Sequence, residues 1–207
     1  MTLVPLMLDL KGKKVVVIGG GHVAKRRVDS LLDTEAFLTV ISPKLIPELI
    51  HHHEKARIDW KQKYFSPDDV EGAFLIITAT NNRTANRIVV ESAPSDCLIN
   101  AADEADAGNV HFPAHFERGK LTVAISTQGA SPLLAKKIKK DLSCQYDERY
   151  EQYLDFLFEV RQLLKQSSFS HQERNNYLHK ILSEVYLDPQ TQKEMLHSLE
   201  HYIKNIN

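Results

Sequence analysis

The stretch Val15-Val16-Val17-Ile18-Gly19-Gly20-Gly21-His22-Val23-Ala24 joins an apolar, β-branched run directly to a glycine-rich turn. This order of strand, turn and helix start is the dinucleotide-binding fingerprint of α/β domains. Gly19 permits the tight turn, Gly21 lets the backbone approach a pyrophosphate, and Ala24 allows close packing of helix on strand. A pyrophosphate would lie on the helix N-terminus, where free N–H groups favour an anion. The alternative is a glycine-rich turn in another α/β domain.

Apolar segments and turns alternate through the first hundred residues. A helical stripe of apolar residues follows the glycine turn, and further helices are expected at 45–53 and 84–92. Four more apolar segments, at 37–41, 58–65, 74–78 and 97–100, are typical of buried strands. The alternation predicts an α/β fold, a Rossmann doubly wound parallel sheet.

The pattern changes after about residue 113. Residues 114–126 predict a hairpin, and Ser131-Pro132 begins a region that is helical in pattern to the end of the chain. Ser170 with Glu173 forms a capping box, and Asp188-Pro189 supplies an N-cap and a first-turn proline. We therefore expect a dinucleotide-binding Rossmann domain at 1–113, a hairpin and helix forming a dimerisation region at 114–146, and a small helical domain at 147–207.

The helical tail has too little core to stand alone, so its apolar stripes must pack against the hairpin region or a second subunit. A homodimer is the favoured interpretation. The sequence alone does not separate it from packing within one chain.

Composition describes an ordinary globular protein of 207 residues, 43% hydrophobic, with a net charge of −1. This charge gives no general reason to expect a nucleic acid partner. No apolar run approaches membrane-spanning length and no signal peptide is evident, so we expect no membrane partner and a cytoplasmic location. Cys97 and Cys144 lack a CxxC partner, and the consecutive residues His51-His52-His53 splay around a helix, so no metal site is predicted.

Several motifs occur in order through about the first 140 residues: Pro5–Gly12, the glycine turn, Thr78–Asn82, Leu98–Asp103, His111–Pro113 and Leu121–Ala135. As a set they resemble the precorrin-2 dehydrogenase family of sirohaem synthesis, in its stand-alone form. The resemblance implies a Rossmann domain, a central dimerisation region, a small helical domain, and NAD-dependent oxidation of precorrin-2 to sirohydrochlorin in sirohaem or cobalamin synthesis. Some members also insert iron, so a dehydrogenase with ferrochelatase activity is the nearest alternative. A non-catalytic NAD-sensing Rossmann module is an alternative of a different class.

Asp103 is the candidate catalytic residue. It follows a predicted strand at the carboxyl edge of the sheet, where doubly wound folds bind ligands. The resemblance places the family's essential aspartate here, where a carboxylate could accept a proton or orient the substrate. On local pattern alone, Asp103 is also consistent with a turn residue that caps the following loop. Ala105 stands where the family commonly has a proline, which puts chelatase activity in particular doubt.

The residues expected near the ribose depart from the usual pattern. An acidic residue about twenty positions after the turn normally holds the ribose hydroxyls of NAD, whereas this chain has Ser42-Pro43-Lys44. Lys44 could favour a 2′-phosphate, but the resemblance favours NAD. Thr80 ends a strand and could line the nicotinamide side or be a simple strand-end hydroxyl. The candidate cofactor residues are Gly19, Gly21, His22, Val23, Ala24, Ser42, Pro43, Lys44 and Thr80.

A second candidate site lies where residues 126–132 end a strand and open a helix. Helix N-termini bind carboxylates, and precorrin-2 carries many of them. An ordinary capped helix is the alternative, and Gln128 replaces a glycine that is common in the family. The candidate substrate-binding residues are Ser126, Thr127, Gly129 and Ser131, with Arg118 and Lys120 nearby in sequence.

Overall fold

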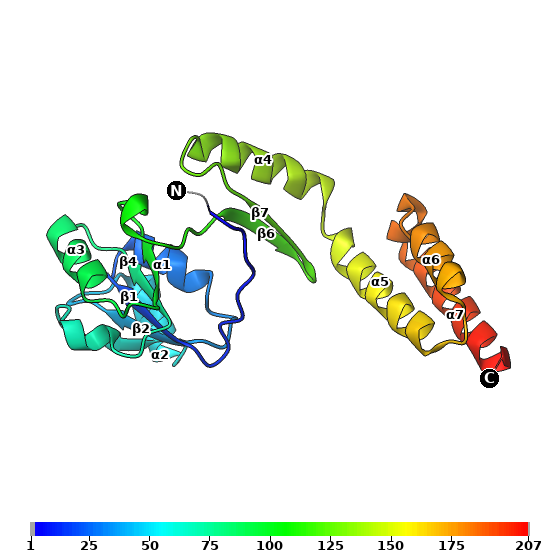
Figure 1. Cartoon of the computed structure of the whole chain (residues 1–207), viewed down its shortest axis with the longest axis horizontal. Coiled ribbons are helices and arrows are strands. Elements are labelled where there is room, and N and C mark those ends of the chain that lie inside the picture. The colour runs from blue at the N-terminus through cyan, green and yellow to red at the C-terminus, as the bar shows by residue number, and fades with distance from the viewer. Residues whose placement is uncertain (1–2, 207) are drawn as a thin grey trace. The chain divides into compact units, whose positions relative to one another are not determined.

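The computed structural model describes residues 3–206 and divides the chain into two compact units, Met1–Phe112 and Pro113–Asn207 (Figure 1). The first contains a parallel sheet with helices and the second contains a hairpin and four α-helices. Each unit has a hydrophobic core of its own.

The first unit is built on a five-stranded parallel sheet in the order β3-β2-β1-β4-β5. Along the chain, β2 and β3 are added on one side of β1, and β4 and β5 are then added on its other side. The strand order therefore reverses between β1 and β4, which is where doubly wound folds bind ligands. The strands are β1 (Lys14–Ile18), β2 (Phe37–Ile41), β3 (Asp59–Lys61), β4 (Leu75–Thr78) and β5 (Leu98–Ala101).

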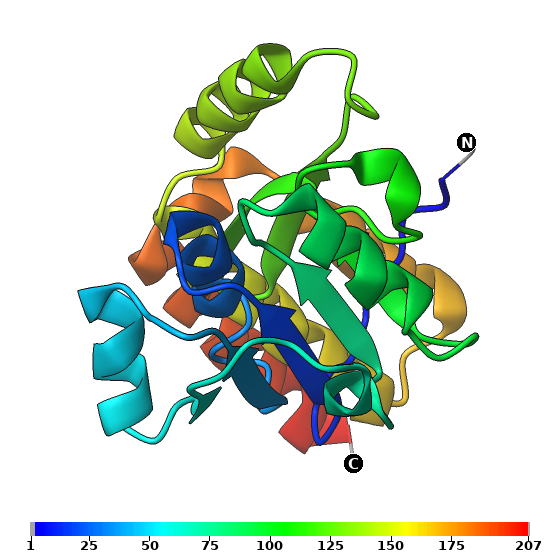
Figure 2. The same cartoon turned by 90° about the vertical axis from the view of Figure 1, so that its left-hand side faces the viewer.

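Helices cover both faces of this sheet, as Figure 2 shows for α1 and α3. Successive strand side chains point to opposite faces, so Val15 and Val17 share a core with Val28 of α1, whereas Val16 packs in a core with Val89 of α3. The predicted Rossmann sheet is confirmed. The helices of this unit are α1 (His22–Asp29), α2 (Pro47–Glu54) and α3 (Arg83–Glu91), with short 3₁₀ turns η1 (Pro67–Val70) and η2 (Ala105–Ala107).

The strand expected at 58–65 is shorter than predicted, because β3 pairs only with β2 and ends at Lys61. Lys63 then turns toward the buried carboxylate of Asp69, with Nζ 2.9 Å from Oδ2. Ser66 caps η1 through the same carboxylate. This local network competes with the sheet ladder and ends the edge strand early.

The second unit begins with an antiparallel hairpin, β6 (Ala114–Arg118) and β7 (Leu121–Ile125), followed by α4 (Pro132–Gln145). Gly119 adopts the left-handed conformation that the tight turn requires, with φ of 53°. Three more helices follow: α5 (Arg149–Gln166), α6 (His171–Lys180) and α7 (Pro189–Ile206), with the 3₁₀ turn η3 (Glu184–Leu187) between the last two. The capping box of Ser170 and Glu173 is confirmed.

The helical tail packs largely on itself, which corrects the expectation that its apolar stripes require the hairpin or a second subunit. Its buried side chains form one cluster rich in aromatic residues. The Phe156 and Tyr186 rings stack with centroids 5.7 Å apart, and the buried Tyr153 hydroxyl donates to the carbonyl of Ile181 at 2.7 Å. Aromatic rings bury large areas, so three helices suffice for a core.

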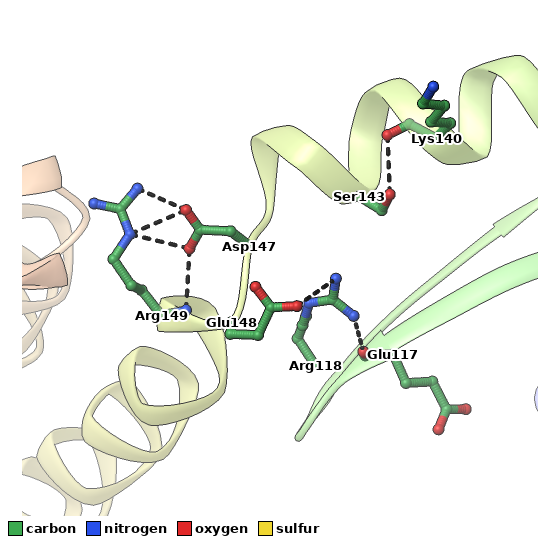
Figure 3. Close-up of polar contacts among 7 residues, drawn as sticks. All are labelled: Glu117, Arg118, Lys140, Ser143, Asp147, Glu148 and Arg149. Carbon is green, nitrogen blue, oxygen red and sulfur yellow. Dashed lines mark hydrogen bonds and ion pairs between the residues drawn. The ribbon is translucent and has the colours of Figure 1, made fainter.

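Charged pairs join the hairpin to the start of α5 (Figure 3). Arg118 donates from Nη1 to the carbonyl of Glu117 at 2.8 Å and pairs through Nη2 with Glu148 at 3.2 Å. Asp147 accepts from both the side chain and the backbone of Arg149, and these hydrogen bonds lower the pKa of Asp147. The turn between α4 and α5 is therefore held by polar contacts.

Candidate active site

The three glycines after β1 have different physical roles. A Cβ on Gly19 would lie 2.4 Å from the carbonyl oxygen of Ala79, and its φ of +127° disfavours any L side chain. A Cβ on Gly20 would lie only 2.0 Å from the carbonyl oxygen of Lys44. A Cβ on Gly21 would meet nothing within 4 Å. The first two glycines allow strand ends to pack closely, whereas the third faces open space.

That space belongs to a cavity of about 590 Å³ at the carboxyl ends of β1, β2 and β4. The cavity lies at the reversal of strand order, as expected for a ligand site in this fold. It brings together six of the predicted cofactor residues: Gly19, Gly21, Ser42, Pro43, Lys44 and Thr80.

The other three predicted cofactor residues, His22, Val23 and Ala24, do not line this cavity. His22 and Val23 are exposed in the first turn of α1, and Ala24 is fully buried. Ala24 therefore has the packing role that was predicted for it, and its contribution to the site is to let α1 approach the sheet.

The geometry fits a dinucleotide. Gly21 is the N-cap of α1 and has no side chain to accept the first helical N–H groups, so these donors and the open space above Gly21 suit a pyrophosphate. The cavity volume lies within the range of roughly 300 to 1,000 Å³ that is usual for small-molecule sites. Gly19, Gly21 and the N-terminus of α1 would hold the phosphates of NAD.

The end of the cavity after β2 has an unusual charge distribution. None of its lining residues within the described part of the chain is Asp or Glu, whereas Lys44 and Lys63 both line it. The Ser42 hydroxyl donates to the carbonyl of Lys44 at 2.7 Å, so its oxygen remains available only as an acceptor. The usual ribose-binding carboxylate is therefore replaced by a hydroxyl and a neighbouring lysine.

Thr80 is fixed by a residue that the sequence did not point out. Its hydroxyl donates to Oδ1 of Asn86 at 2.6 Å and accepts from the backbone of Asn82 at 3.1 Å. Asn86 is 4% exposed and returns a hydrogen bond from Nδ2 to the Thr80 carbonyl at 3.1 Å. The one signal for Asn86 in the sequence is a polar residue on the apolar face of a helix, next to Val89.

Asp103 lines a second cavity of about 270 Å³ between β4, β5 and α3, apart from the residues of the glycine turn. The loop after it is pinned to β5, because Asn109 accepts from the backbone of Ile99 at 2.7 Å and donates to the carbonyl of Cys97 at 3.0 Å. Gly108 packs so closely that a Cβ would lie 2.5 Å from the Ile99 carbonyl oxygen. The backbone therefore sets the position of Asp103.

The predicted substrate residues fall into two groups. Ser126, Thr127, Gly129 and Ser131 lie together in the loop between β7 and α4, where Ser131 caps α4 by accepting from the backbone of Leu134 at 3.2 Å. Gln128 and Gly129 both have positive φ, 49° and 84°. This loop is the left-handed turn that brings the chain into α4.

Arg118 and Lys120 form the other group, at the opposite end of the hairpin. β7 separates them from the loop by about 15 Å of extended chain. Arg118 pairs with Glu148 at 3.2 Å, and Lys120 pairs with Asp155 while lying over the ring of Phe158. Nearness in sequence is therefore not nearness in space here, and the structure does not bring these two cations to the loop.

Residues 3–206 contain neither a metal-binding cluster nor a membrane-spanning helix. No group of three or more His, Cys, Asp or Glu side chains is arranged to hold a metal ion. No helix is long and apolar enough to cross a membrane.

Three family descriptions match successive parts of the chain: putative NAD(P)-binding at 6–114, sirohaem biosynthesis protein central at 118–143, and SirC C-terminal domain at 150–195. The chain is 40% identical to a precorrin-2 dehydrogenase of Priestia megaterium, over 95% of this chain and 98% of that protein. It is 35% identical to a precorrin-2 dehydrogenase of Bacillus subtilis, over 77% of this chain and 98% of the relative.

A solved structure described as SirC, precorrin-2 dehydrogenase, is similar throughout, with a TM-score of 0.85 and 39% identity over 97% of this chain and all of that one. A siroheme synthase of Photorhabdus laumondii is 32% identical over 86% of this chain, which spans 38% of that longer protein.

Proposed function

Because the chain belongs to the precorrin-2 dehydrogenase family, we propose that it oxidises precorrin-2 to sirohydrochlorin with NAD, a step of sirohaem synthesis. The observation that carries this function is the glycine turn, which leaves open space at Gly21 beside a cavity of about 590 Å³. The similarity covers nearly the whole chain, so it includes both this cavity and Asp103.

The reaction removes a hydride and a proton from the tetrapyrrole. NAD, when bound, supplies the hydride acceptor. The N-terminus of α1 would hold its phosphates, and Thr80 offers one remaining acceptor lone pair to the cavity because Asn86 and Asn82 occupy its other positions. Asn86 thereby sets the orientation of the Thr80 hydroxyl toward the cavity.

Asp103 is proposed to accept the proton or to orient the macrocycle. It is exposed at the carboxyl edge of the sheet on a loop whose backbone is pinned to β5. A carboxylate on a fixed loop suits proton transfer, because the donor and acceptor must come within hydrogen-bond distance. The loop formed by Ser126, Thr127, Gly129 and Ser131 is proposed to bind substrate carboxylates, since its backbone turns into a helix N-terminus.

A homodimer is also proposed, and the hairpin supports it more than the helical tail does. Within the described residues, β6 and β7 pair only with each other, so each leaves one edge unpaired. Leu133 and Leu134 of α4 are 78% and 49% exposed. A two-stranded sheet is marginal by itself. Light scattering at micromolar concentration tests the dimer, and a single-chain mass would refute it.

A cytoplasmic location is part of the proposal. The chain has Cys97 and Cys144, and neither forms a disulfide in the structure. Free thiols are usual in a reducing compartment.

The decisive experiment is an anaerobic spectroscopic assay of the wild-type protein and an Asp103→Asn variant with precorrin-2 and NAD. We expect NAD-dependent sirohydrochlorin formation by the wild type, and a loss of roughly a hundredfold or more in kcat for the variant with unchanged NAD affinity. Asp106→Asn is the matched control, because Asp106 is also exposed on the same loop but does not line the cavity of Asp103. A fully active Asp103→Asn variant would remove Asp103 from the mechanism.

A further inference from the structure

We propose that the cavity of about 270 Å³ beside Asp103 is a subsite for one carboxylate side chain of the tetrapyrrole, with Arg83 as its ion-pair partner and Thr78 as a hydroxyl donor. This inference rests on the proposed function. It assigns a specific task to a cavity that the dinucleotide does not need.

Thr78 supplies the first argument. It is fully buried at the end of β4 and its hydroxyl oxygen has no hydrogen-bond partner in the structure. A buried polar group without a partner is costly, and most such groups in folded proteins are paired. Thr78 lies on the same face of β4 as Ile76, which packs toward α3, so its side chain points to the cavity that α3 lines. The hydroxyl thus lacks a partner where a ligand could supply one.

Arg83 supplies the second argument. It is exposed at the first position of α3, lines the same cavity, and makes no ion pair among the described residues. Arg87, one turn further along, already pairs with Glu91, with Nε 2.8 Å from Oε1, and the nearby charge of Glu104 adds to this compensation. Arg83 is therefore the cation that remains for a ligand, and its planar guanidinium matches a carboxylate.

Size and charge then limit the kind of group that fits. A cavity of about 270 Å³ is too small for a macrocycle but accommodates a carboxylated side chain. Asp103, Glu91 and Glu104 all line this cavity, and Glu91 is paired with Arg87, so the ligand must present its negative end to Arg83 and a proton-bearing group to Asp103. An acid side chain attached to a pyrrole ring has both features. The subsite would therefore hold the ring beside the proposed proton acceptor.

The test measures sirohydrochlorin binding by absorbance titration, together with the KM values for precorrin-2 and NAD. We expect Arg83→Gln to raise the Kd for sirohydrochlorin and the KM for precorrin-2 by roughly tenfold to a hundredfold, the usual range for losing a charged hydrogen bond. The KM for NAD stays unchanged. Arg83→Lys should restore part of the affinity. Arg161→Gln is the matched control, because it removes the same charge from an exposed position on α5.

Thr78→Val separates a binding role from a structural one. Because the hydroxyl has no partner in the protein, its removal should leave the melting temperature unchanged or raise it, while the Kd rises roughly tenfold. A Kd within twofold of wild type for both Arg83→Gln and Thr78→Val would overturn the subsite. A loss in Arg83→Gln no larger than in Arg161→Gln would do the same.

The binding measurement also separates this proposal from the proposed function. A wild type that binds sirohydrochlorin but does not oxidise precorrin-2 would refute the dehydrogenase, and the variant Kd values would still decide the subsite. A wild type that binds no tetrapyrrole at all would overturn both.

Discussion

Replacing single glycines of the turn should separate cofactor binding from folding. Gly21 has ordinary extended backbone angles, φ −98° and ψ −169°, and a Cβ there meets nothing within 4 Å. Gly21→Ala loses a favourable N-cap but also restricts the unfolded chain, and these effects offset each other. We expect the free energy of unfolding to change by less than about 0.5 kcal/mol.

The same methyl group would fill the space that the pyrophosphate needs. Crowding of this kind costs about 1 to 3 kcal/mol, so the Kd for NAD should rise roughly fivefold to a hundredfold. Gly21→Asp goes further, because aspartate is a favourable N-cap but its charge repels phosphate. This variant should be at least as stable as wild type and should not bind NAD measurably.

Gly20→Ala is the opposite case. Its Cβ would lie 2.0 Å from the Lys44 carbonyl oxygen and 2.7 Å from the Ser42 hydroxyl, so the segment after β2 must move. The hydrogen bond from Ile46 to the Gly20 carbonyl, 2.9 Å long, is strained by the same movement. We expect a loss of about 1 to 3 kcal/mol in the free energy of unfolding.

The two quantities are measured separately, by fluorescence titration with NADH and by urea unfolding. Wild-type cofactor affinity in Gly21→Ala or Gly21→Asp would show that the dinucleotide does not pass over this residue. Easier unfolding of Gly21→Ala than of Gly20→Ala would contradict the open space at Gly21 and the close contact at Gly20.

Three further predictions concern residues outside the cofactor contacts. Burial alone would raise the pKa of Asp69, but its hydrogen bonds, including one from Lys63, lower it below the ordinary value of 3.8. The stability that the ionised Asp69 contributes is present above pH 3.8 and is lost as the pH falls through its lower pKa in the folded protein. Urea unfolding should therefore show Asp69→Asn less stable than wild type by about 1.5 to 3 kcal/mol at pH 7, with a smaller difference in acid. Burial raises the pKa of the Cys97 thiol to about 11, so mass spectrometry after iodoacetamide treatment of the native protein should find alkylation at exposed Cys144 alone, and labelling of Cys97 would contradict its burial. Tyr153→Phe removes a buried hydrogen bond to a backbone carbonyl and should lower the free energy of unfolding by about 1 to 3 kcal/mol, measured by urea unfolding, whereas an unchanged midpoint would show that the bond contributes nothing.

The sequence predicted the parts of the site that depend on local order along the chain. Gly19 and Gly21 follow a strand and precede a helix, and this order is enough to place them at the sheet edge. The close approach at Gly20 depends on the carbonyl of Lys44, in the segment after β2, which the pairing of β1 with β2 brings near. No local pattern contains that information, so the middle glycine had no predicted role.

Two features of the second unit differ from the arrangement expected from the sequence, for a related reason. Arg118 and Lys120 were grouped with the loop at Ser126 because they are close in sequence, yet a strand between them extends the chain and separates them. The helical tail was expected to lack a core, but Phe156 and Tyr186 stack within it and fill the space between the helices. Sequence distance and residue counts do not capture either strand extension or aromatic packing.

The position of β4 explains how one sheet edge can serve both halves of the proposed reaction. Thr80 follows this strand and lines the cavity proposed for the dinucleotide, whereas Thr78 ends it and lines the cavity of Asp103. Asn86 lies between them: it lines the second cavity and holds Thr80 through two hydrogen bonds. A shift of α3 would therefore change both cavities together. The hydrogen bonds of the buried Asn86 amide therefore fix the position of the proposed hydride-accepting cavity relative to the proposed proton-accepting one. A hydrophobic contact is non-directional and would not fix it in this way.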